Sequence, residues 1–158
     1  VDWVGVDATR YFFLMRPPQS PFTFDVDLAR RQTDENPIFY VQMAHARMSG
    51  ILRNAGLAPE AVQGTLDVSV LEDGDRELLK KLTAFPEAVM RAARDAQPHR
   101  VTTYLDELAR TTHGWYHGCR VLGEPEPIMQ ARLLLARAAR QVLANGLALL
   151  GISSPDRM

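Results

Sequence analysis

Apolar residues in this chain of 158 residues recur at intervals of three and four, the spacing that lines one face of an α-helix. Residues 36–55 show the pattern most clearly, with an apolar face made of Ile38, Val41, Met48 and Leu52 and interrupted once, by His45. The stretch opens on Asn36 and Pro37, residue types that suit the first positions of a helix. No stretch alternates apolar and polar residues as a half-buried strand would. The pattern therefore predicts an all-α fold.

The rest of the chain carries further helical patterns, and we expect helices at 7–16, 24–32, 75–84, 86–96, 98–122 and 127–150. Proline stands near the start of three of them, where its missing N–H costs nothing. Residues 57–76 lack this periodicity and are expected to form a solvated loop with short helical turns. The last helix is apolar around most of its circumference and is expected at the centre of an antiparallel helical bundle.

Charge is divided unevenly between the two halves of the chain. Residues 1–77 hold 7 Arg and Lys against 12 Asp and Glu, whereas residues 78–158 hold 11 against 7. Sixteen of the 18 basic residues are arginine, which binds phosphate through two parallel hydrogen bonds and stacks on bases. A GC-rich genome would produce the same arginine excess, so the charges indicate a nucleic-acid partner only weakly.

Side chains that could run a reaction do not form any catalytic or metal-binding motif. His113 and His117 are one helical turn apart near the single cysteine, Cys119, but no carboxylate or second cysteine completes a zinc motif. Neither a glycine-rich phosphate loop nor a nucleophile elbow is present. His45 is expected to be a hydrogen-bonded core residue and Cys119 an inert buried thiol. We therefore predict no catalytic residue, no metal and no internal disulfide.

The chain shows neither a membrane span nor a signal peptide. No apolar run approaches the roughly 18–20 residues that a span needs, so we expect a cytoplasmic location without membrane contact. The chain opens on Val1 within a pattern rather than on Met, which favours a piece of a longer protein. Its length suffices for one sizeable core, and a helical monomer is expected.

Aromatic and arginine side chains form a second face on two of the expected helices. Tyr40, Met43 and Arg47 lie three and four residues apart, away from the apolar face of their helix. Tyr116 and Arg120 share a face of a later helix. Aromatic rings stack on unpaired bases for about 1–3 kcal/mol each, and arginine binds phosphates. The two faces suggest single-stranded RNA binding, although exposed tyrosines and arginines are common on helices.

Seven blocks follow one another along the chain: VGVDATRYFFLMR, NPIFYVQMAHAR, LTAFPEAVMRAA, PHRVTTYLDELA, WYHGCRVL, QARLLLARAARQVLANGLALLG and PDRM. In their order and spacing they resemble the C-terminal region of arginyl-tRNA synthetases, which are class I synthetases with a DALR-type anticodon-binding domain. The resemblance covers essentially the whole chain. It implies that residues 1–33 are the end of the catalytic domain and a stem-contact connector that leads into the bundle. Residues 34–158 would form the anticodon-binding bundle of the class Ia synthetase type.

The resemblance implies an activity for the complete enzyme, which attaches arginine to tRNA(Arg) with ATP and Mg²⁺. Recognition in that family relies chiefly on the cytosine at the middle position of the anticodon. Neither the HIGH-type nor the KMSK-type ATP motif occurs in this chain. By itself the chain is therefore expected to bind no cofactor and to be inactive. The implied partners are tRNA(Arg) and the catalytic domain of the same polypeptide.

The resemblance also implies which residues meet the anticodon, namely Tyr40, Arg47, Tyr116 and Met158. Many relatives carry a second tyrosine at the position of Met43. Methionine is polarisable enough to cover a base, although it stacks less well than tyrosine, so Met43 is expected as a fifth residue that meets the anticodon. Possible contacts to the tRNA backbone are expected at three further positions, Arg120, Arg137 and Asn145.

Two alternatives stay open. The domain could belong to another class I synthetase with a related helical anticodon-binding domain. It could also be a helical protein-interaction module, which would bind no RNA and would tolerate substitution of Tyr40 and Tyr116.

Overall fold

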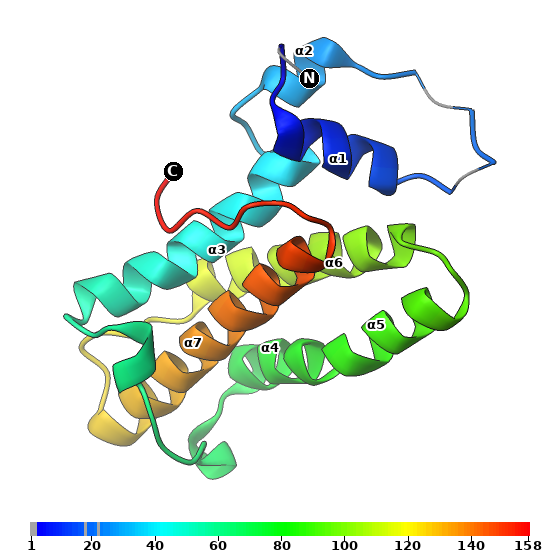
Figure 1. Cartoon of the computed structure of the whole chain (residues 1–158). Coiled ribbons are helices and arrows are strands. Elements are labelled where there is room, and N and C mark those ends of the chain that lie inside the picture. Colours follow the sequence, from blue (N-terminus) through cyan, green and yellow to red (C-terminus); the bar gives the residue numbers. More distant parts are fainter. Residues whose placement is uncertain (1–2, 18, 22) are drawn as a thin grey trace.

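The computed structural model describes residues 3–17, 19–21 and 23–158, so Val1, on which the chain opens, lies outside the described residues. Within these ranges the regular structure is helical and contains no strand, which confirms the all-α prediction (Figure 1). The elements are α1 (Val6–Leu14), α2 (Val26–Arg30), α3 (Pro37–Asn54), the 3₁₀ turns η1 (Pro59–Ala61) and η2 (Val68–Val70), α4 (Asp73–Thr83), α5 (Phe85–Arg94), α6 (His99–Gly118) and α7 (Glu126–Leu149).

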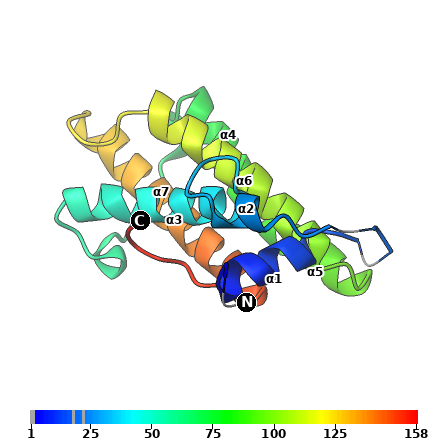
Figure 2. The ribbon, with the colours of Figure 1, turned by 90° about the horizontal axis from the view of Figure 1, so that it is seen from above.

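Helix α7 occupies the centre of the bundle, as its apolar circumference predicts. It packs against α3, α4 and α6, and its pair with α3 is the most extensive in the molecule. Figure 1 shows α7 running back alongside α3 in the opposite direction. Viewed from above, α1 and α2 lie over the end of the bundle where α3 begins and α7 ends (Figure 2). No helix in the described ranges is both long and apolar enough to cross a membrane.

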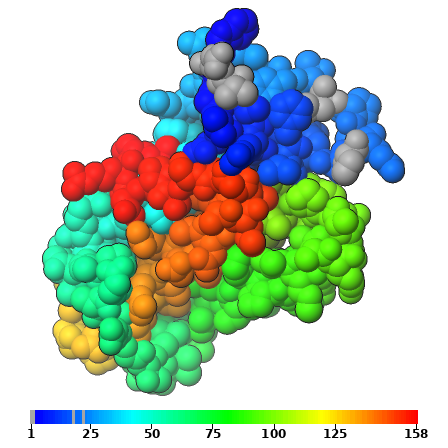
Figure 3. Space-filling view, viewed as in Figure 1, coloured from blue at the N-terminus to red at the C-terminus, as the bar shows by residue number. Residues whose placement is uncertain are grey.

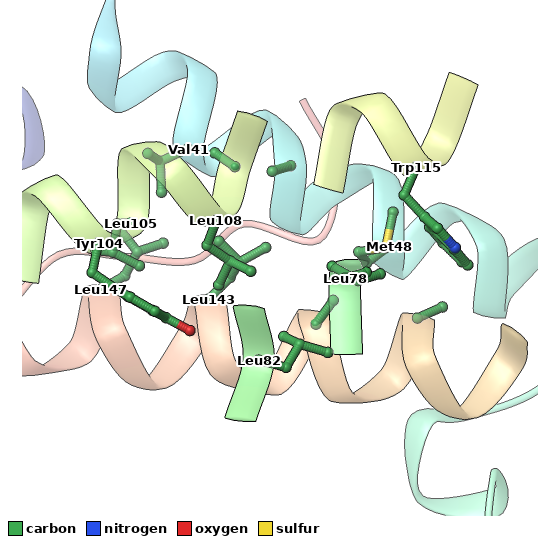
Figure 4. Close-up of a cluster of buried hydrophobic side chains, with 14 of the residues drawn as sticks. Val41, Met48, Leu78, Leu82, Tyr104, Leu105, Leu108, Trp115, Leu143 and Leu147 are labelled. Atoms are coloured by element: carbon green, nitrogen blue, oxygen red, sulfur yellow. The ribbon is translucent and has the colours of Figure 1, made fainter. Parts of the chain in front are cut away.

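The core fills the space between α3, α4, α6 and α7. Figure 4 shows the side chains that converge there, labelled Val41, Met48, Leu78, Leu82, Tyr104, Leu105, Leu108, Trp115, Leu143 and Leu147. All ten are buried. Burial of each large apolar side chain stabilises the fold by about 1.5–3 kcal/mol, so the core holds the surface side chains of α3 and α6 on a rigid support.

Gly146 lets α6 and α7 approach each other closely. A Cβ atom at this position would lie only 2.6 Å from Leu105 Cδ2, and Leu105 is completely buried. Because packed interiors have almost no spare volume, the absence of a side chain at Gly146 sets the separation of the two helices.

The N-terminal residues pack onto the bundle rather than extending from it. Tyr11 of α1 is fully buried. Its hydroxyl group donates a hydrogen bond to the carboxylate of Asp106 and lies 3.3 Å from the carbonyl oxygen of Thr102. Helix α1 therefore contacts α6 as well as α3. The division at residues 33 and 34 into a connector and a bundle stays a prediction.

Helix α6 is shorter than the sequence pattern predicts. The expected helix over 98–122 ends at Gly118, and Cys119 is already in an extended conformation, with φ −116° and ψ 114°. The amide of Cys119 closes the last turn on the carbonyl oxygen of Trp115. Arg120 therefore lies outside the helix, and the prediction that it shares a helical face with Tyr116 is wrong.

Asn36 occupies the N-cap position of α3 but does not cap it with its side chain. Its Nδ2 group instead donates to the carbonyl oxygens of Ala29, at 3.1 Å, and Arg31, at 2.8 Å. The amide thus ties the end of α2 to the start of α3, and the first turn of α3 relies on Pro37, which has no N–H to satisfy.

Candidate nucleic-acid interface

A surface pocket of about 480 Å³ opens where α3, the end of α6 and the C-terminal segment meet. It is lined by Met43, Ala46, Arg47, Gly50, Ile51, Arg53, Asn54, Tyr116, Arg157 and Met158. Four of the five residues predicted to meet an anticodon, from three distant parts of the chain, are in this list. The fifth, Tyr40, does not line the pocket and lies one turn before Met43 on α3.

Arg47 is held in place between α3 and α6. Its Nη1 group lies 2.7 Å from His113 Nδ1 and 3.2 Å from His117 Nε2. Its Cζ atom lies 5.3 Å from the centre of the Tyr116 ring, within the range of a cation–π interaction. The guanidinium group and the tyrosine ring therefore form one unit at the pocket.

His113 joins this unit to the backbone of α3. Its Nε2 atom lies 3.0 Å from the carbonyl oxygen of Tyr40. A carbonyl can only accept and arginine can only donate, so Nε2 carries the hydrogen and Nδ1 offers its lone pair to Arg47. The imidazole is thus neutral. Burial, reinforced by the nearby Arg47 cation, lowers the pKa of His113 below its ordinary value.

The two tyrosine rings of this region differ in their surroundings: Tyr116 faces solvent, whereas Tyr40 packs against His113. Tyr116 is 41% exposed and offers a ring to solvent. The Tyr40 ring lies 4.3 Å from the His113 ring, centre to centre, at an angle of 48°. Met43 is half-buried in α3 between Tyr40 and Arg47. An aromatic, a thioether and a guanidinium therefore do line one face of α3, as the spacing predicts.

The C-terminal segment crosses α3 (Figures 1 and 3), and Met158 at its end lines the pocket. His45, which is 1% exposed, donates from Nδ1 to the carbonyl oxygen of Pro155 at 2.9 Å. The prediction of a hydrogen-bonded core histidine is confirmed. Burial lowers the pKa of His45, which keeps the imidazole neutral.

Asp156 fastens the same segment to two helices. Its Oδ1 atom accepts hydrogen bonds from Ser49 Oγ of α3, at 2.7 Å, and from Arg140 Nη2 of α7, at 2.9 Å. Arg53 Nη1 also donates to the Asp156 carbonyl oxygen at 3.3 Å. These bonds leave Met158, 51% exposed, at the rim of the pocket.

The three possible backbone contacts lie elsewhere. Arg137 Nη1 donates to the carbonyl oxygen of Val62 at 2.7 Å and so ties the loop before α4 to α7. Asn145 accepts from Gln141 on the surface of α7. Arg120 bonds within its own turn. None of the three lines the pocket, and a role for them in tRNA contact stays a prediction.

No group of three or more metal-binding side chains occurs in the part of the chain that the structure describes. His113 and His117 instead bind the Arg47 guanidinium. Cys119 is half-buried rather than buried, because α6 ends just before it, and burial raises the pKa of its thiol. The expected metal-free arrangement and the unreactive character of this thiol stay predictions.

Charge makes the pocket suitable for RNA. Arg47, Arg53 and Arg157 line it, and no carboxylate side chain does so among the described residues. Of these arginines, the sequence analysis identified only Arg47. The i, i+4 spacing of His113 and His117 was visible in the sequence, but it did not show that both histidines face Arg47.

The comparisons with known proteins agree with this geometry. Residues 41–158 match the DALR anticodon binding domain family. The chain is 46% identical, over 159 aligned positions, to an arginine–tRNA ligase of Bordetella petrii and 48% identical, over 161, to one of Geobacter metallireducens. These alignments cover all of this chain but only 28% and 29% of the two relatives.

A solved structure supports the same assignment. The arginyl-tRNA synthetase of Thermus thermophilus superposes on 96% of this chain with a TM-score of 0.83 and 35% sequence identity, and the match covers 26% of that protein. The chain therefore belongs to the family of DALR anticodon-binding domains and corresponds to the C-terminal region of arginyl-tRNA synthetases.

Proposed function

We propose that this chain recognises the anticodon of tRNA(Arg), and that an unpaired anticodon base enters the pocket between α3, α6 and the C-terminal segment. The observation that carries the proposal is the meeting of Met43, Arg47, Tyr116 and Met158 at one pocket in a chain that belongs to an anticodon-binding family.

The side chains suggest a division of roles. Tyr116 stacks on a base, because its ring is exposed beside the pocket and every base has a π-face. Met43 and Met158 cover the base with polarisable apolar surface. Arg47 binds a base edge or a phosphate with the N–H groups that the histidines leave free, and Arg53 and Arg157 attract the backbone.

We infer further that the complete protein is a cytoplasmic arginine–tRNA ligase, whose catalytic domain binds ATP and Mg²⁺ and packs against this chain. The 158-residue chain itself lacks both ATP motifs. Arginine-dependent ATP–pyrophosphate exchange is therefore expected to be absent from the purified chain. Exchange by material free of host enzyme would contradict this assignment of catalysis to the missing part.

The direct test measures binding of two anticodon stem-loop RNAs to the chain by fluorescence anisotropy. One RNA carries an arginine anticodon, and the other has its middle cytosine replaced by guanine. Tyr40→Ala and Tyr116→Ala should each cost about 1–3 kcal/mol of binding to the first RNA, through lost stacking, and little for the second. Tyr116→Phe, which keeps the ring, should bind as the parent does.

The melting temperature of each variant is measured beside its affinity, because a tyrosine also packs. A Tyr116→Ala variant that melts normally and binds both RNAs as the parent does would contradict the role of the pocket. A parent chain that binds neither RNA would favour a helical protein-interaction module.

A further inference from the structure

We propose that His113 is a positioning residue for the anticodon pocket, because it holds Arg47 in the place where the guanidinium group meets the RNA. This inference rests on the proposed function and adds to it a residue that does not itself line the pocket.

The geometry that carries the inference is a relay of two hydrogen bonds between α3 and α6. The first runs from His113 Nε2 to the carbonyl oxygen of Tyr40 and fixes the ring orientation. The second runs from Arg47 Nη1 to His113 Nδ1 at 2.7 Å. Because the first bond places the hydrogen on Nε2, the lone pair on Nδ1 is left pointing at Arg47.

Fixing Arg47 in advance matters because arginine is long and flexible. A free guanidinium group would lose rotamer freedom when RNA binds, whereas a group that is already held loses little. The Arg47 Cζ atom also lies 5.3 Å from the Tyr116 ring centre, so the relay through His113 supports the stacking ring as well. His113 itself is 4% exposed and therefore acts through Arg47.

The arrangement requires the neutral form of His113. The charged or titratable groups that face it are Arg47 of α3, His117 of α6 and Asp34 of the segment before α3. Protonation of Nδ1 would replace the acceptor by a second donor directed at the Arg47 cation. The hydrogen bond would then be lost and the two cations would repel each other.

Two variants of similar size separate the two hydrogen bonds of His113. In His113→Asn, Oδ1 takes the place of Nδ1 and can still accept from Arg47. In His113→Gln, the amide nitrogen takes the place of Nε2 and can still donate to Tyr40, but the acceptor for Arg47 is lost. We expect the Asn variant to bind the arginine stem-loop within about twofold of the parent, and the Gln variant to bind about tenfold more weakly.

The effect of His113→Gln is measured a second time in a chain that carries Arg47→Ala. If His113 acts through Arg47, His113→Gln should cost nothing further in a chain that already carries Arg47→Ala. An equal cost with and without Arg47, or equal affinities of the Asn and Gln variants, would overturn the inference. A parent chain that does not distinguish the two stem-loops would contradict the proposed function and this inference together.

The unmodified chain offers a readout that needs no substitution, provided that circular dichroism shows the chain still folded at each pH. The ¹⁵N signals of His113 should show hydrogen on Nε2 and none on Nδ1 at neutral pH. As the pH falls, the ratio of affinities for the cytosine and guanine stem-loops should fall with the same midpoint as the protonation of His113. Protonation of His113 without a change in this ratio would overturn the inference.

Discussion

Asp75 and Arg132 form an ion pair that is closed off from water inside the bundle. Arg132 Nε lies 3.1 Å from Asp75 Oδ1, and the two side chains are 4% and 0% exposed. Trp115 Nε1 donates to the same carboxylate oxygen at 2.7 Å. Burial by itself would raise the pKa of Asp75, but hydrogen bonds from Arg132 and Trp115 outweigh it and lower the pKa. The ion pair thus joins α4 to α7, and the hydrogen bond from Trp115 joins α6 to both.

Removal of Asp75 should lower the free energy of unfolding far more than removal of one partner of a surface ion pair would. Asp75→Ala would leave the Arg132 guanidinium and the Trp115 N–H without their buried acceptor, and we expect a loss of about 3–5 kcal/mol in the free energy of unfolding. Glu72→Gln is the control, because Glu72 pairs with Arg132 from a position that is 68% exposed and should cost less than about 1 kcal/mol. Urea unfolding measures both, and equal losses would show that the buried pair has no special role.

Two glycines in helices should respond to alanine in opposite directions. Gly146→Ala places a methyl group against Leu105 and should destabilise the fold by about 1–3 kcal/mol through overpacking. At Gly114 of α6 no atom lies within 4 Å of the added Cβ, so Gly114→Ala should stabilise the fold by about 0.5–1 kcal/mol through helix propensity. Denaturant midpoints measure both, and a Gly146→Ala chain as stable as the parent would show that α6 and α7 can move apart freely.

Stability should fall in mild acid because two histidines are buried in neutral form. Burial lowers the pKa of His45 and His113 below 6.5, the value of an unperturbed histidine. Below about pH 6.5 the unfolded chain therefore binds protons that the folded chain does not, and each histidine costs up to about 1.4 kcal/mol per pH unit. Above that pH both states are neutral and the effect vanishes.

The pH effect is measured by urea unfolding at about pH 7.5 and pH 5.5. His113→Asn, which cannot titrate, serves as the control and should reduce the difference between the two values. A free energy of unfolding that is unchanged at the lower pH would mean that both histidines accept protons without disturbing the fold.

The C-terminal segment should detach from the bundle when the side-chain hydrogen bonds of Asp156 are removed. Asp156→Ala removes the acceptor of Ser49 and Arg140, so residues 153–158 should exchange amide hydrogens faster and binding of the arginine stem-loop should weaken as Met158 leaves the pocket. Because Asp156 is 58% exposed, global stability should fall by less than about 1 kcal/mol.

Hydrogen exchange by mass spectrometry and RNA anisotropy test this expectation together. Asp67→Ala is a suitable control, since Asp67 accepts hydrogen bonds from the nearby Ser69 and does not line the pocket. Unchanged exchange in 153–158 would show that the other hydrogen bonds of the segment, from His45 to Pro155, from Ser153 to Asp7 and from Gln42 to Ser153, hold it without help from Asp156.

The sequence alone determined approximately where the helices lie and which face of α3 is buried. The spacing of apolar residues placed α3 at 36–55, against Pro37–Asn54 in the structure, because helical periodicity is a local property that a few turns of chain fully express. The seven sequence blocks also supplied Met43, Arg47, Tyr116 and Met158, which line one pocket. The expected face of α3 was likewise readable, because its residues are neighbours on a single helix.

Only the tertiary structure decided which side chains meet across helices. Asp75 and Arg132 stand 57 positions apart, and Arg47 and His113 stand 66 apart, so no spacing rule connects them. Such pairs depend on the crossing and rotation of packed helices, which follow from how the whole core fills its volume. The end of α6 at Gly118 was missed for a related reason, because the apolar pattern continues into a turn that packs against the same core.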